Sequence, residues 1–368
     1  MHKIKINLKS SPDRSYSIYL ENGLFGRISL FLRKNNFAGK YAVISDSNVA
    51  KIYGDKLVAN LKQSGIPAVL FTFKAGEPSK SISTTEKLLN GLISKGFTRK
   101  DGIIALGGGI TGDIAGFVAS VFMRGIPFVQ VPTSLLAMVD SSIGGKTGVN
   151  LAGGKNLAGT FYQPRSVLID PELLKTLPKE ELMNGFAEII KYGVIANDKL
   201  FCLLEKERNK VLSLNIEMLN KIIIQCCKFK ASITEKDEQE SGLRMILNYG
   251  HTAGHAIERL SSYKISHGRA IAIGMGIINK IAVNLHMLSN KDELRTNNLL
   301  KIYGLNDKFL EIFRAGNAPR KLWSIMQKDK KMQKSKISFI IPTSIGKTKI
   351  YDGITKEIFL KSFDKMSK

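Results

Sequence analysis

The residues best suited to metal chemistry are three of the chain's five histidines, His251, His255 and His267. His251 and His255 stand four residues apart, so a helix places both imidazoles on one face, one turn apart. Thr252 follows the first of them, where a zinc protease of the H-E-x-x-H type needs glutamate, and this excludes that class. Glu188, in an earlier helical segment, offers a carboxylate as a further donor. Two histidines, a carboxylate and an open position suit a catalytic zinc ion, although a histidine pair alone is more often structural.

A glycine-rich turn at residues 107–112 reads GGGITG and satisfies G-x-G-x-x-G, after an apolar strand and at the start of a helix. Glycines let the backbone approach a pyrophosphate, and the N–H groups of the helix start hold its charge. The acid usually found about 20 residues later is missing, since Pro127 and Phe128 stand there. Asp46, at the end of the apolar segment Tyr41–Ser45, is another acid for ribose hydroxyls. An ordinary glycine turn is the alternative, and the motif alone does not decide between them.

Residues 131–156 read VPTSLLAMVDSSIGGKTGVNLAGGKN and combine glycines with two lysines, one aspartate and several hydroxyls. Free backbone N–H groups beside lysines favour an oxyanion-binding cradle. The alternative is a pair of polar surface loops. Because long loops between packed elements tend to be functional, we favour the cradle.

The first half of the chain alternates strands and helices. Strands are predicted at residues 3–8, 16–20, 41–45, 68–73, 102–106, 128–131 and 167–169, and helices at 48–63, 83–95 and 110–123. This alternation predicts a parallel, doubly wound, Rossmann-like sheet. After Pro178 the pattern becomes helical, at 179–195, 201–209, 217–236, 251–260 and 268–288, with one late strand at 336–341. We therefore expect an α/β domain over residues 1–178 and an all-α domain over residues 179–368.

Composition limits the partners. Lys and Arg total 55 against 31 Asp and Glu, a net charge of +24 that attracts nucleic acid, anionic membranes or phosphorylated metabolites. The lysines are scattered, and no aromatic-rich basic strand or recognition helix supports nucleic-acid binding. No apolar run reaches the about 18 residues of a membrane span. An odd cysteine total (Cys202, Cys226, Cys227) favours a reducing cytoplasm, so we expect a cytoplasmic protein without nucleic-acid or membrane partners.

Read together, these segments resemble the 3-dehydroquinate synthase family over residues 40 to 345. The matching stretches are GGGITGDIAGFVAS, RGIPFVQVPTSLLAMVDSSIGGKTGVN, GKNLAGTFYQP, FAEIIKYG, LNYGHTAGHAIE and HGRAIAIGM, in order and at family-like spacing. The resemblance implies an N-terminal α/β domain that binds NAD and a C-terminal helical domain that holds one divalent metal, zinc first and cobalt second. The site then lies between them.

The resemblance also implies roles for individual residues. The zinc ligands are Glu188, His251 and His267. The NAD-binding residues are Asp46, Asn48, Glu77, Lys80, Gly108, Gly109, Asp113, Thr133 and Ser134. The catalytic residues are His255, Lys146, Lys191, Asp140 and Asn156. The substrate-binding residues are Arg124, Lys155, Lys230, Arg244, Asn248, Lys330 and Lys331, with one of the last two on the phosphate. Arg124 matches a residue that reaches the neighbouring subunit's site, which implies a homodimer.

The family activity converts 3-deoxy-D-arabino-heptulosonate 7-phosphate to 3-dehydroquinate and phosphate, in the shikimate pathway to aromatic amino acids. The substrate carries about three negative charges near neutral pH, and the lysines and Arg244 supply the positive charges that bind them. In the family reaction a ring carbinol gives hydride to NAD, with the metal as Lewis acid, and phosphate leaves. The hydride then returns, the ring opens and an aldol step closes the carbocycle. His255 is the candidate proton shuttle.

Three positions depart from the family pattern. Arg269 stands where glutamate is usual, Ala253 where phenylalanine is usual, and Ser134 where threonine is common. We expect Ala253 only to repack a helix, Ser134 to keep the hydroxyl, and Arg269 to leave metal binding intact.

Three other functions compete with this interpretation. The nearest is another sugar phosphate cyclase, such as a 2-deoxy-scyllo-inosose or valiolone-type synthase. The presence of Lys146, Lys230 and Arg244 favours a substrate with a carboxylate and so argues against it. The second is a metal-dependent alcohol dehydrogenase, which releases NADH, and the third is a basic nucleic-acid-binding protein.

Overall fold

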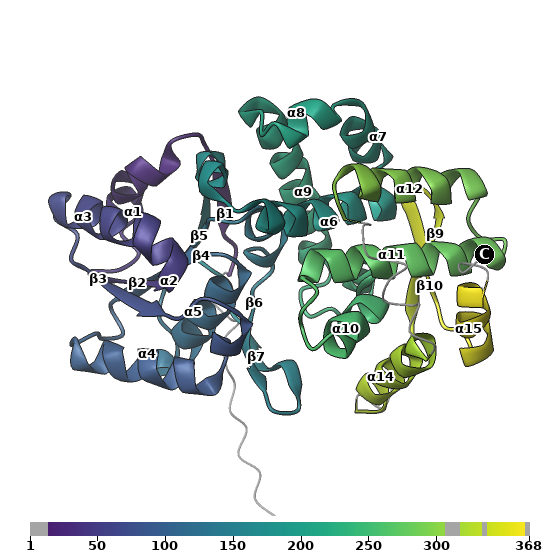
Figure 1. The fold of residues 1–368 in the computed structure, drawn as a ribbon. Helices are drawn as coiled ribbons and strands as arrows, with labels where there is room; N and C mark the ends of the chain where they lie inside the picture. Colours follow the sequence, from purple (N-terminus) through teal and green to yellow (C-terminus); the bar gives the residue numbers. More distant parts are fainter. Residues whose placement is uncertain (1–13, 306–316, 333–336, 365–368) are drawn as a thin grey trace, which may run out of the picture.

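The computed structural model describes residues 14–305, 317–332 and 337–364. An α/β part lies beside a largely helical part (Figure 1), in the order that the sequence predicts. The strand predicted at residues 3–8 lies outside the described residues. Within the described part, no helix is long and apolar enough to cross a membrane.

Six strands form the parallel sheet of the α/β part. Their order is β1 (Ser17–Leu20), β8 (Ser166–Ile169), β5 (Phe128–Pro132), β4 (Gly102–Gly107), β2 (Tyr41–Asp46) and β3 (Ala68–Phe73). Along β2, Tyr41 and Val43 pack into one apolar cluster while Ala42 and Ile44 pack into another on the opposite face. Apolar clusters therefore cover both faces of the sheet, which explains why the strand sequences are continuously apolar. The predicted doubly wound sheet is confirmed.

Helices on both faces complete this part. They are α1 (Ile28–Asn35), α2 (Ser47–Val49) with the π-helical η2 (Ala50–Gly54), α3 (Asp55–Gln63), α4 (Ile82–Ser94) and α5 (Gly109–Val121). The chain leaves β2 toward β3 at one edge of the sheet and returns through β4, β5 and β8 toward the other edge. Ligands of such sheets bind outside the carboxyl ends of the strands at this reversal, here between β2 and β4.

The segment after β5 is more regular than the sequence suggested. It forms a π-helical turn, η5 (Ala137–Ser141), and an antiparallel hairpin of β6 (Lys146–Leu151) and β7 (Gly154–Phe161). A Cβ on Gly159 would overlap the backbone of Thr147, so glycine allows the two strands to pair. The alternative of plain surface loops is wrong for this segment, because its glycines concealed the alternation of a strand.

The second part is largely helical. Its helices are α6 (Lys179–Ala196), α7 (Asp198–Lys206), α8 (Arg208–Leu212), α9 (Ile216–Lys236), α10 (His251–Leu260), α11 (His267–Asn284), α12 (Asn290–Ile302), α14 (Ala318–Met332) and α15 (Lys356–Asp364). The expectation of an all-α part needs one correction. The predicted late strand is β9 (Phe339–Ser344), and it pairs antiparallel with a strand that was not predicted, β10 (Lys347–Tyr351).

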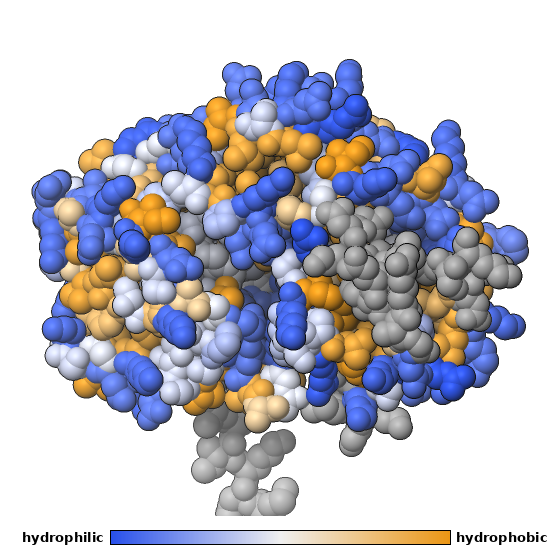
Figure 2. All heavy atoms as spheres, in the orientation of Figure 1, coloured by the Kyte–Doolittle hydropathy of each residue, from blue (hydrophilic) through white to orange (hydrophobic). Residues whose placement is uncertain are grey.

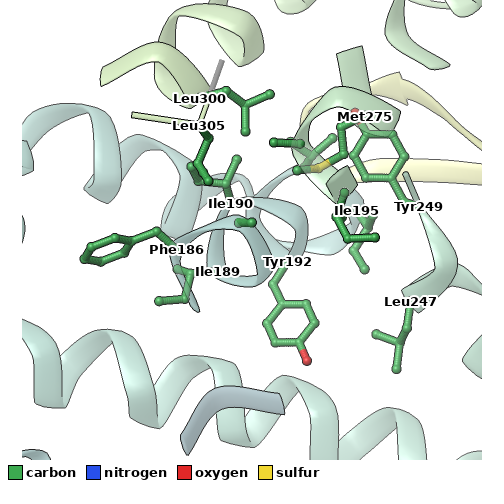
Figure 3. Close-up of a cluster of buried hydrophobic side chains, with 14 of the residues drawn as sticks. Phe186, Ile189, Ile190, Tyr192, Ile195, Leu247, Tyr249, Met275, Leu300 and Leu305 are labelled. Carbon is green, nitrogen blue, oxygen red and sulfur yellow. The ribbon is translucent and has the colours of Figure 1, made fainter. Parts of the chain in front are cut away.

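Helix α6 is the centre of the main core. Figure 3 shows Phe186, Ile189, Ile190 and Tyr192 of α6 among apolar side chains from several other elements, including Met275 of α11. The same cluster takes in side chains that follow β5 in sequence, namely Leu135, Met138 and Val139. The core therefore runs from one part into the other, and the domain boundary at residue 178 stays a prediction.

Glycines bring α6, α10 and α11 close together. A Cβ on Gly274 of α11 would overlap the carbonyl oxygen of Gly250, just before α10, and a Cβ on Gly268 would overlap the backbone of Asn184 in α6. Gly268 N also donates to Asn184 Oδ1 at 2.9 Å. These contacts fix the starts of α10 and α11, where His251 and His267 stand.

Replacing Gly274 by alanine tests this close packing. The added methyl group pushes α10 and α11 apart, and overpacking of this kind costs about 1–3 kcal/mol of unfolding free energy. Urea denaturation measures the loss. Gly26→Ala is the matched control, because a Cβ there meets no described atom within 4 Å. An unfolding free energy equal to that of the control would contradict the close contact.

Candidate active site

Three predicted ligands meet at one point of the helical part. Glu188 Oε1 lies 3.5 Å from His251 Nε2 and 3.6 Å from His267 Nε2, and all three ligand atoms lie within 4.8 Å of one another. The residues come from α6, α10 and α11, so the glycine contacts above are what bring them together. Two imidazole nitrogens and a carboxylate oxygen form the donor set of a zinc site with room for a further ligand.

The surroundings of Glu188 fit a cation. Its side chain is fully buried, and Oε1 accepts no hydrogen bond from a described residue. Lys191, one turn further along α6, forms an ion pair with Oε2 and leaves Oε1 facing the histidines. Burial alone would raise the pKa of Glu188, but the charges of Lys191 and His251 outweigh it and lower the pKa to about 2. The carboxylate thus stays ionised, and a divalent ion beside Oε1 would satisfy it.

The two histidines respond differently to this setting. Burial and the nearby Lys191 charge lower the pKa of His251 well below its usual range. For His267, burial lowers the pKa, but contacts with Glu188 and Glu258 more than compensate and raise it to about 9. A metal ion bound at His267 would have to displace that proton.

A second group of charges is buried between α9 and the turn η5. Lys230 forms an ion pair with Asp140 Oδ1 and donates to the Asp140 backbone oxygen at 2.5 Å. Tyr192 donates to Asp140 Oδ1 at 2.5 Å. Burial opposes ionisation of Asp140, but the charges of Lys230 and Lys191 prevail and hold its pKa below the usual range. Burial lowers the pKa of Lys230, which Asp140 partly restores.

Further polar residues face the hairpin end of the site. Lys146 pairs with Glu240, which also accepts from Asn248 Nδ2 at 2.7 Å. Arg244 is almost fully buried, and its Nη1 donates to the carbonyl oxygens of Gly144 at 3.2 Å and Glu238 at 2.6 Å. The basic residues are therefore held by carboxylate and carbonyl oxygens in this structure.

A cavity of about 1530 Å³ lies between the two parts. Hairpin residues such as Lys155 and Asn156 line it from one part, and His251, His255 and Glu258 line it from the other. In the view of Figure 2, hydrophilic and hydrophobic side chains both border the hollow in the middle of this face. A cavity of this size, with charged side chains in its lining, is large enough for a charged metabolite together with a larger cofactor.

The residues predicted to bind NAD stand at the carboxyl ends of neighbouring strands. Gly108 is the N-terminal cap of α5 and offers no side-chain acceptor, so the first N–H groups of α5 remain available to a pyrophosphate. A Cβ on Gly108 would lie 3.3 Å from Ser134 Oγ, and Thr133 N donates to Gly107 O at 3.0 Å. The glycine turn and the residues after β5 thus form one edge.

Asp46 lies at the same edge, but both of its carboxylate oxygens already accept hydrogen bonds. Its Oδ1 accepts from the N–H groups of Asn48 and Val49 at the start of α2, and its Oδ2 accepts from Thr111 at 3.2 Å. Asn48 itself is exposed. Asp46 therefore couples the end of β2 to the first turn of α5.

A cluster of paired side chains joins this edge to the hairpin. Lys80 pairs with Asp113 at 2.5 Å and also donates to Asn156. Burial raises the pKa of Asp113, against the lowering charge of Lys80. Glu77 accepts from Asn150 Nδ2 at 2.7 Å. The predicted residues Glu77 and Lys80 thus contact the hairpin directly, and Lys80 does so through the predicted residue Asn156.

Other predicted residues are not drawn into these contacts. Arg124 is exposed at the end of the short helix η4 (Phe122–Arg124). Lys330 and Lys331 belong to the last turn of α14, and their side chains lie outside what the structure describes. Among the departures, Arg269 is half-buried in the first turn of α11, and Ala253 is fully buried in the core.

Sequence reasoning missed two carboxylates of the site, Glu240 and Glu258. Glu240 lies in a polar stretch without a recognisable motif, so its contact with Lys146 had no signal. Glu258 did have one. Together with His251 and His255 it follows the spacing i, i+4, i+7, which places all three on one face of a helix.

Comparison with known proteins gives relatives along nearly the whole chain. Family models of the N-terminal and C-terminal regions of 3-dehydroquinate synthase match residues 70–184 and 185–332. A curated 3-dehydroquinate synthase from Prochlorococcus marinus (strain AS9601) is 45% identical over 368 residues, covering 99% of this chain and 100% of the relative.

Solved structures show the same fold. The 2-epi-5-epi-valiolone synthase from Streptomyces hygroscopicus subsp. jinggangensis 5008, with NAD+ and Zn2+ bound, gives a TM-score of 0.88 at 24% identity, covering 98% of this chain and 99% of that chain. A 2-deoxy-scyllo-inosose synthase complexed with carbaglucose-6-phosphate, NAD+ and Co2+ gives 0.83 at 28% identity, covering 95% and 96% of the two chains.

Fold and site together place this chain among the sugar phosphate cyclases, which are carbon–oxygen lyases. Within that class, both halves match one family, and the identity to a curated member of it extends over almost every residue. The chain belongs to the 3-dehydroquinate synthase family.

The substitution Asp140→Asn tests the buried pair with Lys230. It leaves a buried ammonium without its carboxylate, a loss of about 3–5 kcal/mol of unfolding free energy. Since burial already lowers the pKa of Lys230, the unpaired lysine releases its proton as pH rises. The deficit is therefore expected to be largest near about pH 6 and to shrink toward about pH 9.

Urea denaturation at both pH values measures this deficit. Asp352→Asn is the control, because Asp352 is exposed and the change in charge is the same. A deficit for Asp140→Asn that is no larger than the control at either pH would show that the pair does not support the fold.

Proposed function

We propose that this chain converts 3-deoxy-D-arabino-heptulosonate 7-phosphate to 3-dehydroquinate and phosphate, as a 3-dehydroquinate synthase of the shikimate pathway. The observation that carries the proposal is the 45% identity to a curated enzyme of that name over 99% of this chain. The geometry supports it, since one carboxylate and two histidines lie beside a cavity whose lining includes lysine and asparagine side chains.

The proposal includes NAD and one divalent metal, zinc first and cobalt second. Support comes from the related cyclases, whose structures hold NAD+ with Zn2+ or Co2+. NAD supplies a hydride acceptor that later returns the hydride, and the metal supplies a Lewis acid that acidifies the substrate alcohol. Glu188, His251 and His267 would hold the metal.

The cofactor itself would lie along the carboxyl edge of the sheet. Gly108 and Gly109 let its pyrophosphate approach the start of α5, and Thr133 and Ser134 stand beside that turn. The remaining proposed contacts, on the adenosine side and on the approach from the hairpin, are Asp46, Asn48, Glu77, Lys80 and Asp113.

The chain's own residues bind and orient a substrate with about three negative charges. Proposed contacts are Lys146, Asn156, Lys155, Lys191, Lys230, Arg244, Asn248 and one lysine of the pair Lys330 and Lys331. Several of these cations are already held by carboxylates, so substrate anions exchange with Glu240 or Glu258 rather than meet bare charge. These contacts select one substrate conformer, and much of the rate enhancement follows from that positioning.

Proton transfer falls to His255. It is exposed at the cavity, and its ring centroid lies 5.3 Å from that of His251. Imidazole titrates near neutral pH and can both accept and return a proton. Asp140 orients Lys230 and Tyr192 beneath the same site.

We also propose a cytoplasmic homodimer in which Arg124 enters the neighbouring site. Met123 and Arg124 have φ angles of 50° and 66°, a left-handed conformation that is strained for side chains of this kind. The exposed apolar side chains of Val121 and Met123 precede Arg124 in sequence. Strain and apolar exposure at one corner are typical of a surface used in recognition.

Phosphate release tests the activity. With Zn2+ and catalytic NAD, phosphate should appear in large excess over NAD and without NADH build-up, because the hydride returns within each turnover. A chelator should stop release and added Zn2+ should restore it. Glu188→Gln should lose most of the activity, whereas Glu180→Gln, an exposed change on the same helix, should keep it. NADH that accumulates with an alcohol substrate would instead indicate a dehydrogenase.

Complementation tests the shared site. Arg124→Ala and Lys191→Met should each be inactive alone, and co-expression with two affinity tags yields mixed dimers. Each mixed dimer contains one complete site of two, so the purified mixed dimers should recover about half of the wild-type activity. No recovery in purified mixed dimers would show that Arg124 acts within its own subunit or not at all.

A further inference from the structure

Both ligand histidines turn their second ring nitrogen toward an oxygen. His251 Nδ1 lies 3.2 Å from the carbonyl oxygen of Tyr249, and His267 Nδ1 lies 3.6 Å from Glu258 Oε2. Their Nε2 atoms face Glu188, as described above. Each imidazole is thus oriented between the metal position and an acceptor, one a neutral carbonyl and the other a carboxylate.

Glu258 is a buried carboxylate with partners on two sides. It lies on α10 with its side chain 5% exposed, and its Oε1 accepts from Lys155 Nζ at 3.1 Å. Lys155 stands near the tip of the β6–β7 hairpin, where its ammonium also lies 4.3 Å from the ring centroid of Tyr263. A single carboxylate therefore connects a metal ligand of the helical part to the hairpin of the α/β part.

We propose that Glu258 is a positioning residue for the metal site, which fixes the ring of His267, and that Lys155 fixes Glu258. The inference rests on the proposed function and deepens it. A carboxylate on Nδ1 selects the tautomer with a free Nε2 and makes that nitrogen a stronger donor. Because Lys155 belongs to the hairpin, the position of the hairpin then influences metal binding.

Glu258 is not itself the better metal ligand. His255, Glu258 and His267 form a second cluster with ligand atoms within 4.8 Å of one another. Within that cluster, however, the Glu258 oxygens already meet Lys155 and His267. Glu188 Oε1 faces the two imidazole rings while Lys191 pairs with Oε2, so Glu188 is the carboxylate with an oxygen open to an ion.

Zinc affinity of the full-length, metal-free protein tests the proposal. Competition with a chromophoric chelator gives the dissociation constant for wild type and variants, and the visible spectrum of the Co2+-loaded protein reports the ligand geometry. Glu258→Gln should weaken zinc binding about 10–100-fold and change the Co2+ spectrum. Lys155→Met should shift both measurements in the same direction by a smaller factor. Glu180→Gln should leave both unchanged.

The outcomes separate this proposal from the proposed function. Wild-type affinity and spectrum in both Glu258→Gln and Lys155→Met would overturn the positioning role while leaving the enzyme proposal intact. Abolished binding in Glu258→Gln with unchanged binding in Glu188→Gln would make Glu258 a ligand and overturn the proposed metal site. No zinc binding by wild type would overturn the metal part of both. If Glu258→Gln fails to fold, Lys155→Met alone decides, since Lys155 lies at the cavity edge.

Discussion

The burial of the Glu188 carboxylate is the constraint on which the rest of the site depends. A charge in an apolar core is tolerated only when cations or metal ions surround it, and the apolar helix α6 leaves Glu188 no access to water. Lys191 neutralises one oxygen, and two imidazoles face the other. The close packing of α10 and α11 at their glycines therefore has an electrostatic purpose as well as a steric one, because it brings those imidazoles within reach.

Charges of alternating sign continue outward from Glu188 to the cavity. The pairs Lys230 with Asp140, Lys146 with Glu240 and Lys155 with Glu258 place each cation beside a carboxylate. The side chains of the site are therefore close to charge balance, although the whole chain carries a net charge of +24. The cations near the cavity are balanced locally, so they are oriented before an anion arrives, and orientation contributes more to recognition than net charge does.

The parts of the fold that follow from local pattern were predictable from the sequence. Parallel strands buried on both faces read as apolar runs, and α10 begins at His251 and ends at Leu260 as its periodicity predicts. The candidate metal ligands could be found from residue type, because the chain has few histidines and two of them have helical spacing. Glu240 was missed because its partner, Lys146, lies more than 90 residues away along the chain. Glu258 was missed although its spacing from His251 and His255 places it on their helix face. Strand β10 and the β6–β7 hairpin were missed because glycine and lysine hide the alternation of their faces.

The two parts are held together by two kinds of contact, and the difference between them bears on function. On one side, Leu135, Met138 and Val139 enter the apolar core around α6, where separation would expose apolar surface to water. On the other side, the hairpin meets α10 through Lys155 and Glu258, which line an open cavity. Ion pairs beside water exchange partners at a small net change in free energy, whereas apolar packing does not. An anionic substrate that replaces Glu258 at Lys155 can therefore alter the hairpin contact without disturbing the core. The hairpin side of the site is thus adjustable, and the apolar side around α6 is fixed.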